Sequence, residues 1–458
     1  MKKNLLFALS SLCALAASAA VEVAGGVSGT PANLNDEQYR NQDVILLPST
    51  ESPAQGAYFS GDTASPTTGT TLKSMTVKPS EEGPREWVLS RNITLDANGS
   101  ESDYILDMGT KKTTYWLPTS GWFTIDNTGA STSSVKVRFG DFLFQNGSIS
   151  FFNFYTDAEV SGTSLSLGSG NGYEGKLTMR IGNSALGKTA NVVYGVGTTS
   201  FLKWASLNVQ RGSSFTVAQG AVLSFANTST FDLAGTLKYE NTSSFLDIAG
   251  NMTIAETGSA VLSNALSIVK GGVVNIEARS DGSAAISRTS TGNGRIILNG
   301  GTLKVAAKNA LVVNVIGLFA GSSSTLELSA RNEINNIYFN SNTKLTLVLT
   351  GADASALVKS FGGAVDLAIE GFANEKVFFD SDGWWDSAKI TATDGSKTYT
   401  KEQLELVATT GEMTSQGKYV LSLITVPEPS SYALVLGAIA IAFVLKRKAA
   451  ALTARRGR

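Results

Sequence analysis

A short unit recurs through the middle of the chain and constrains the fold more than any other feature. Phe215, Phe231, Phe245 and Val261 open successive units at spacings of 16, 14 and 16 residues, each after a serine-containing pair. A short apolar segment, a glycine turn and a second apolar segment follow each of them. One such unit cannot bury its own apolar face, whereas a stack of units buries a continuous core. The repeat therefore predicts an all-β solenoid.

Period-two alternation of apolar and polar residues extends this prediction along the chain. Alternation of this kind is the signal of a half-buried strand, and clear examples are 207–209, 215–217 and 345–347. We expect the solenoid to cover residues 85–350. The turn in Gly294 to Val305, GRIILNGGTLKV, resembles the repeats of autotransporter passenger domains and related right-handed parallel β-helices. That resemblance implies a right-handed parallel β-helix and carries no catalytic motif.

The segments on either side of the repeats differ in composition. Residues 21–84 are richer in Pro, Ser and Thr, so we expect a loosely packed N-terminal arm or cap. Residues 351–425 lose the repeat and contain Trp384, Trp385 and Tyr399. The end of a solenoid exposes strand edges that need covering, which predicts a C-terminal β-cap here.

The N-terminal 20 residues are typical of a signal peptide. Lys2 and Lys3 precede an apolar stretch from Leu5 to Ala17, and Ala17-Ser18-Ala19 supplies small residues for cleavage. The apolar stretch is short for a membrane anchor, which needs about 20 residues. We therefore expect export through the Sec machinery and removal of residues 1–20 by signal peptidase.

Residues 426–458 form a tripartite tail. Pro427-Glu428-Pro429 precedes an uncharged run, and Lys446-Arg447-Lys448 follows it as a basic stop. We expect a transmembrane helix over 431–446, although the 14 uncharged residues from Tyr432 to Leu445 reach only ~21 Å. Such a length is short for a hydrocarbon core of about 30 Å, and it suits a transient anchor.

This tail resembles the PEP-CTERM sorting domain, which exosortases recognise. The order, spacing and terminal position of its three parts all match. The resemblance implies an inner-membrane intermediate, processing near Pro427-Glu428-Pro429, and delivery to the cell surface or extracellular matrix. Some ice-binding proteins carry similar tails, so the tail specifies a destination and no activity.

The residue types that are absent restrict the chemistry of the body. The chain has no histidine, and its one cysteine, Cys13, lies in the leader. A thiol nucleophile, a disulfide and a Cys/His zinc site are therefore excluded from the body, and we expect no cofactor. Eight of the 37 basic residues lie in the two terminal segments, which leaves an acidic body without attraction for nucleic acid.

Residues 182–189, GNSALGKT, match the P-loop pattern. A P-loop needs a helix after it to direct N–H groups at phosphate. The β-branched, glycine-punctuated residues that follow instead favour a turn between strands.

Two groups of acidic residues are candidates for a catalytic carboxyl pair. They are Asp157 with Glu159, and Glu101 with Asp103 and Asp107. Glycosidases need two carboxyl groups roughly 5–10 Å apart. Neither group stands out from scattered surface charge, so we do not expect an enzyme.

The segment from Asp380 to Asp386 contains the remaining candidate ligand residues. Asp380, Asp382 and Asp386 supply the oxygen atoms that calcium prefers, although Trp384 occupies the third ligand position of an EF-hand loop. Trp384 and Trp385 could instead stack on a sugar ring or pack within the cap. Six aromatic residues also cluster between 142 and 155, where core packing and a ligand groove are both open: Phe142, Phe144, Phe151, Phe152, Phe154 and Tyr155.

The sequence thus favours a non-catalytic surface or matrix protein with a role in adhesion or biofilm structure. A carbohydrate-binding or polysaccharide-active β-helix is the alternative, with extracellular polysaccharide as partner. Ice binding is a third hypothesis, although no regular Thr-x-Thr ladder is visible.

Overall fold

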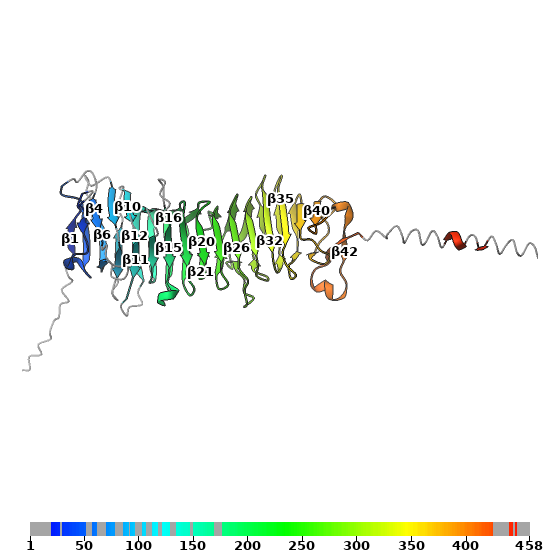
Figure 1. Ribbon diagram of the computed structural model, residues 1–458, viewed down its shortest axis with the longest axis horizontal. Coiled ribbons are helices and arrows are strands. Elements are labelled where there is room, and N and C mark those ends of the chain that lie inside the picture. Colours follow the sequence, from blue (N-terminus) through cyan, green and yellow to red (C-terminus); the bar gives the residue numbers. More distant parts are fainter. Residues whose placement is uncertain are drawn as a thin grey trace, which may run out of the picture.

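The computed structural model describes the following residues: 20–27, 30–51, 57–61, 70–77, 86–90, 92–96, 103–106, 112–117, 121–128, 134–146, 150–168, 176–424, 439–442 and 445–446. They form an all-β solenoid of about 13 turns. The molecule is elongated, with β1 (Val21–Ala24) at one end and β42 (Leu404–Ala408) at the other (Figure 1). The expected fold class, an all-β solenoid, is confirmed.

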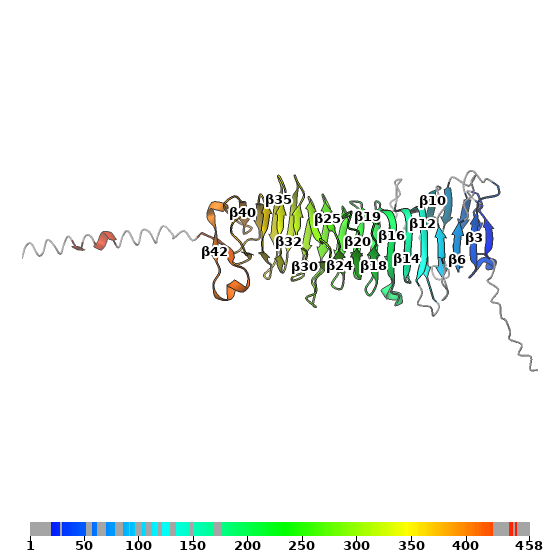
Figure 2. The same ribbon diagram turned by 180° about the vertical axis from the view of Figure 1, so that it is seen from behind.

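Three parallel ladders run along the solenoid, and we name them faces A, B and C. Between the first and the last turn, each turn contributes one strand to each face, except where β12, β14 and β16 are long enough to serve both A and B. Figure 2 shows the strands from the opposite side.

Face A contains β1, β3 (Asp43–Leu47), β6 (Ser74–Val77), β9 (Asp103–Leu106), β12 (Val135–Asn146), β14 (Ala158–Leu167), β16 (Asn191–Phe201), β18 (Ser214–Val217), β21 (Thr236–Tyr239), β24 (Ser259–Leu262), β27 (Ile286–Arg288) and β30 (Leu311–Val312). A separate sheet continues it with β33 (Arg331–Ile334), β36 (Ser355–Val358) and β39 (Val377–Phe379). Face B contains β2 (Ala32–Asn33), β4 (Ala57–Ser60), β7 (Glu86–Ser90), β10 (Lys112–Leu117), the shared strands, β19 (Val222–Phe225), β22 (Leu246–Ile248), β25 (Ala265–Val269), β28 (Arg295–Asn299), β31 (Ile316–Leu318), β34 (Ile337–Phe339) and β37 (Phe361–Gly363).

Face C is a single 15-stranded sheet. It contains β5 (Thr70–Leu72), β8 (Ile93–Asp96), β11 (Gly121–Asp126), β13 (Ser150–Phe154), β15 (Leu177–Ile181), β17 (Ala205–Val209), β20 (Thr230–Leu233), β23 (Asn251–Ile254), β26 (Val273–Ile276), β29 (Thr302–Val305), β32 (Ser323–Leu328), β35 (Lys344–Leu349), β38 (Asp366–Glu370), β40 (Lys389–Thr393) and β41 (Thr398–Thr400).

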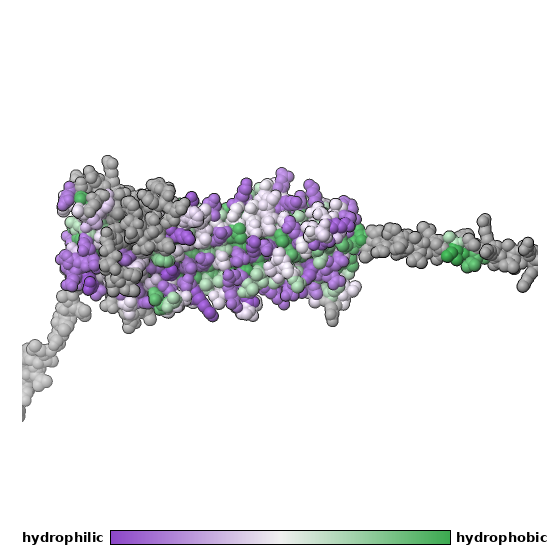
Figure 3. All heavy atoms as spheres, viewed as in Figure 1, coloured by the Kyte–Doolittle hydropathy of each residue, from purple (hydrophilic) through white to green (hydrophobic). Residues whose placement is uncertain are grey.

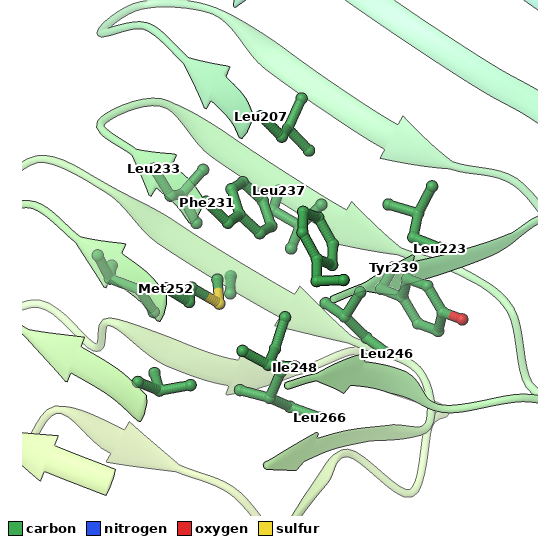
Figure 4. Close-up of a cluster of buried hydrophobic side chains, with 14 of the residues drawn as sticks. Leu207, Leu223, Phe231, Leu233, Leu237, Tyr239, Leu246, Ile248, Met252 and Leu266 are labelled. Atoms are coloured by element: carbon green, nitrogen blue, oxygen red, sulfur yellow. The ribbon is translucent and has the colours of Figure 1, made fainter. Parts of the chain in front are cut away.

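Alternation along each strand separates the core from the surface. On β20, Phe231 and Leu233 are buried, whereas Asp232 is exposed. Parallel register then places buried residues of successive turns beside one another, so that Phe231 lies between Leu207 and Met252. Figure 4 shows these side chains meeting in the interior. One hydrophobic cluster connects Val23 to Leu421 and accounts for the cohesion of the rod.

The 14–16-residue unit of the sequence is not one turn of the solenoid. Phe215 lies on face A and Phe231 on face C, and the next two units open at the start of β22 on face B and within β24 on face A. Each unit therefore advances two strands, or two thirds of a turn. A full turn in this region takes about 23 residues. Ser259 and Thr236, for example, are 23 residues apart in the chain, and their hydroxyl groups are hydrogen-bonded between adjacent turns.

The parallel ladder extends beyond the boundaries expected from composition. At the N-terminal end, β1, β3 and β4 pair within the ladder, so the described strands before residue 78 contribute turns of the solenoid itself. Beyond residue 350, β36, β38 and β40 continue the parallel pairing.

Between the strands that the structure describes, antiparallel pairing occurs only at the C-terminal end. β41 folds back on β40, and β43 (Tyr419–Leu423) pairs with both β39 and β42. Two short 3₁₀ helices, η3 (Lys401–Gln403) and η4 (Gly411–Ser415), connect these strands. The remaining 3₁₀ helices are η1 (Glu37–Tyr39) and η2 (Ser184–Leu186).

The expected transmembrane helix over 431–446 lies mostly outside the described residues. Of this segment the structure describes 439–442 and 445–446, which are helical. In the described part of the chain, no helix is both long and apolar enough to cross a membrane. The signal peptide 1–20, apart from Ala20, and the tail motifs Pro427-Glu428-Pro429, Arg447 and Lys448 are outside the described residues.

Candidate functional site

An open groove of about 420 Å³ lies on the outer surface of face C, over β5, β8, β11, β13 and β15. It combines aromatic, charged and hydroxyl-bearing side chains, and 3₁₀ helix η2 closes one edge. The groove is lined by Thr71, Thr94, Asp96, Trp122, Thr124, Asp126, Thr128, Phe151, Asn153, Tyr155, Arg180, Leu186 and Lys188.

Strand alternation determines which side chains reach the groove. In β11, Phe123 and Ile125 point into the core and are fully buried, so Trp122, Thr124 and Asp126 face outward. The same alternation on β13 buries Phe152 and Phe154 and directs Phe151 and Asn153 outward. The register places Trp122 beside Phe151 and Thr124 beside Asn153.

Asp126 and Lys188 form a partly buried ion pair at the edge of the groove. The Lys188 Nζ donates to both carboxylate oxygens of Asp126, at 3.1 and 3.2 Å. Burial raises the pKa of Asp126 above its ordinary value, and the Lys188 ammonium opposes that shift. The ion pair thus holds a carboxylate in a site from which water is largely excluded.

Asp96 lies directly beside Asp126 in the ladder. Its carboxylate accepts hydrogen bonds from the Thr128 backbone N–H at 3.0 Å and the Thr128 hydroxyl at 2.6 Å. Both acids of this neighbouring pair therefore have protein partners.

Asn153 is the most informative polar residue of the groove. It is only 3% exposed, and its Nδ2 donates to the Thr124 hydroxyl at 3.1 Å. Its Oδ1 is buried and has no hydrogen-bond partner among the described residues. A buried acceptor without a partner costs about 1–3 kcal/mol, so this oxygen would gain from a donor supplied by a ligand.

The aromatic surface of the groove is supported by a cation. The Arg180 guanidinium lies 4.3 Å from the Phe151 ring centroid. With Lys188 it balances the two carboxylates of Asp96 and Asp126. The groove therefore presents paired charges, aromatic rings and hydroxyls, with no net charge from these four side chains.

The two tryptophans singled out in the sequence lie far from this groove, in the C-terminal cap. Trp384 is 8% exposed and packs edge-on against Phe361 and Phe379, at ring distances of 4.6 and 4.8 Å. Its Nε1 donates to the Ser381 carbonyl. Trp385 is partly buried against Trp384, with the Lys401 ammonium over its ring. These contacts favour packing, the alternative that the sequence left open.

The aspartates Asp380, Asp382 and Asp386 lie around the same turn. Among the described residues, no three Asp, Glu, His or Cys side chains come together in a group able to hold a metal ion. Asp382 instead interacts with the Tyr419 hydroxyl, which raises the pKa of that tyrosine.

The P-loop-like segment 182–189 forms a turn in the structure. A bridge between Asn183 and Lys188 closes it, and strand β16 follows. The helix that a phosphate loop requires is therefore replaced by a strand, and Lys188 contacts Asp126.

Of the two acidic groups named in the sequence, the structure describes only Asp157 and Glu159 in full. Asp157 accepts hydrogen bonds from the backbone and side chain of Asn191, and Glu159 is exposed on face A. Glu101 and Asp107, and the side chain of Asp103, lie outside the described part of the structure.

The aromatic cluster divides into core residues, Phe152 and Phe154, and groove residues, Phe151 and Tyr155. The side chains of Phe142 and Phe144 are not described.

Sequence reasoning missed most of the groove. Trp122 and Asp126 lie within no recognisable motif, Lys188 belongs to the P-loop-like segment 182–189 that predicted a different chemistry, and Asn153 reaches Thr124 across 29 residues. The available signal was the outward position of Trp122 in an alternating strand.

No protein-family model, curated protein or solved structure matches this chain.

Proposed function

We propose that this protein is an exported, non-catalytic scaffold of the cell surface or extracellular matrix. The observation that carries the proposal is the rod of parallel turns that ends in the antiparallel cap. A rod held by its capped end would present its long sides to the surroundings. We also propose a right-handed solenoid, because crossovers between parallel strands take that hand in about 98% of cases.

The proposed route begins with the Sec machinery and signal peptidase. The tail then holds the protein at the inner membrane through 431–446, with Lys446-Arg447-Lys448 on the cytoplasmic side. An exosortase-like enzyme processes it near Pro427-Glu428-Pro429 and releases the body for adhesion or biofilm structure. The surface in Figure 3 supports residence in water, because hydrophilic side chains cover much of the visible body.

The route is tested by expressing the full chain in an exosortase-bearing bacterium and fractionating the cells. We expect the native chain at the surface or in the matrix, and a variant with alanine at Pro427, Glu428 and Pro429 in the inner membrane. A matched control replaces Pro48 by alanine, outside the tail. An unchanged distribution of the triple variant would refute the sorting step.

A second candidate function is binding of an extracellular polysaccharide, favoured by the aromatic and polar groove on face C. The ice-binding hypothesis has less support. Charged residues occupy the position two after the threonine in several turns of face C, as in Thr230-x-Asp232, Thr302-x-Lys304 and Thr325-x-Glu327. Charged side chains interrupt the flat hydroxyl array that such binding needs.

A further inference from the structure

We propose that the face C groove binds a neutral, linear saccharide, with one sugar ring on Trp122 and a sugar hydroxyl donating to Asn153 Oδ1. The proposal deepens the second candidate function and rests on it, and it does not depend on the sorting route. It combines three features of the groove: an unpartnered acceptor, an aromatic surface and balanced charge.

The unpartnered acceptor of Asn153 indicates that the ligand carries a hydrogen-bond donor. Asn153 Oδ1 is buried and without a partner among the described residues, while its own Nδ2 is already engaged with Thr124. The ligand must therefore supply a hydrogen-bond donor at this point. The Thr94 side chain also lines the groove, and a hydroxyl can donate or accept. A ligand rich in hydroxyl groups can bond to both kinds of group.

The aromatic rings of the groove indicate that the ligand also has an apolar face. Trp122 and Phe151 face outward on adjacent strands, and Trp122 retains partial exposure. An aromatic ring offers a large rigid contact at low cost in conformational entropy. A saccharide ring presents an apolar C–H face and a polar hydroxyl rim, which matches rings beside Asn153 and Thr94.

The charges argue for a neutral ligand. Lys188 is paired with Asp126, Asp96 is bonded to Thr128, and Arg180 lies over Phe151. The four charges sum to zero, so the groove has no net electrostatic preference for an anionic or a cationic ligand.

The dimensions of the groove indicate a linear ligand. It crosses five neighbouring strands from β5 to β15. Four steps of ~4.8 Å between strands correspond to ~19 Å along the solenoid, which exceeds a single sugar ring.

The test uses full-length protein and a panel of neutral hexasaccharides: glucans, mannans and galactans in α and β linkage, with a polyuronate hexasaccharide for comparison. Calorimetry measures affinity and tryptophan fluorescence reports contact. We expect at least one neutral hexasaccharide to bind. Trp122→Ala should weaken that binding about tenfold or more, as for a buried aromatic anchor. Asn153→Ala should weaken it by a smaller factor.

Two further variants make the outcome specific. Trp204→Ala removes a tryptophan that is 37% exposed outside the groove and should leave the affinity unchanged. Trp122→Phe keeps a ring, so it should retain most of the affinity and lose the fluorescence change, with circular dichroism confirming the fold. No neutral binding, binding of the polyuronate alone, or unchanged affinity in Trp122→Ala would overturn the proposal. These binding results are independent of where the protein is located in the cell. Cell fractionation therefore tests the sorting proposal separately.

Discussion

Truncation of Phe231 tests the inward and outward assignment of the solenoid strands. The side chain is fully buried on β20, with Leu207 and Met252 as its neighbours on adjacent turns. Its ring stacks on Phe225 at 5.3 Å and an interplanar angle of 7°. The flanking backbone ladders hold these neighbours apart, so little collapse into the cavity is expected. Phe231→Ala should therefore lower the free energy of unfolding by about 4–5 kcal/mol, near the upper end for such changes.

The matched control is Thr230→Ala, one residue earlier on the same strand and facing outward. It should cost about 0.5 kcal/mol. Guanidinium unfolding followed by circular dichroism measures both variants. Hydrogen exchange should show lost protection in β17, β20 and β23, and unchanged protection in β35, because each turn contacts only its neighbours. Equal destabilisation by the two substitutions would refute the assignment.

Two further predictions concern polar groups. Asn332 is fully buried on β33, where it accepts from the Ala310 N–H at 3.0 Å and donates to the Ala307 carbonyl at 2.9 Å. Asn332→Ala should lower the free energy of unfolding by about 2–4 kcal/mol in thermal or denaturant unfolding, because it leaves this N–H and this carbonyl without their side-chain partner. A cost below that of Thr230→Ala would contradict this role. Asp394 accepts from the backbone N–H groups of Ser396 and Lys397, which lower its pKa. A lowered pKa stabilises the fold above the unfolded pKa of about 3.8, and this contribution is lost as pH falls. The difference in Tm between native protein and Asp394→Asn should thus be full at pH 7 and shrink below pH 4, and a difference independent of pH would count against it.

The sequence was informative where structure follows from local alternation. Leu207 and Val209, and Leu345 and Leu347, are buried as their spacing predicts. The length of a turn was not predictable from the same pattern. The sequence unit advances two strands, whereas a turn has three, so the unit of the sequence differs from the unit of the fold. Short N-terminal strands such as β4, Ala57–Ser60, lie among Pro- and Ser-rich segments that hide the ladder.

The groove could not be predicted from the sequence for a different reason. Trp122, Asn153 and Lys188 meet only because parallel register brings successive turns together. Their separation in the chain depends on loop lengths, which vary from turn to turn. Alternation can place Trp122 outside the core, but it cannot identify its neighbours. The site therefore became visible only with the register of face C.

Cysteine cross-linking tests the three-stranded turn most directly. The body contains no cysteine, so Cys13→Ser gives a clean background. Thr302 and Thr325 are partners on adjacent turns of face C, and Thr346 is the next in line. Cysteines at 302 and 325 would be ~4.8 Å apart between Cα atoms, within disulfide range, whereas 302 and 346 would be ~9.6 Å apart and outside it. We predict rapid oxidation of the first pair only, measured by mass spectrometry. Failure of the 302–325 pair, or equal oxidation of the 302–346 pair, would contradict the solenoid described above.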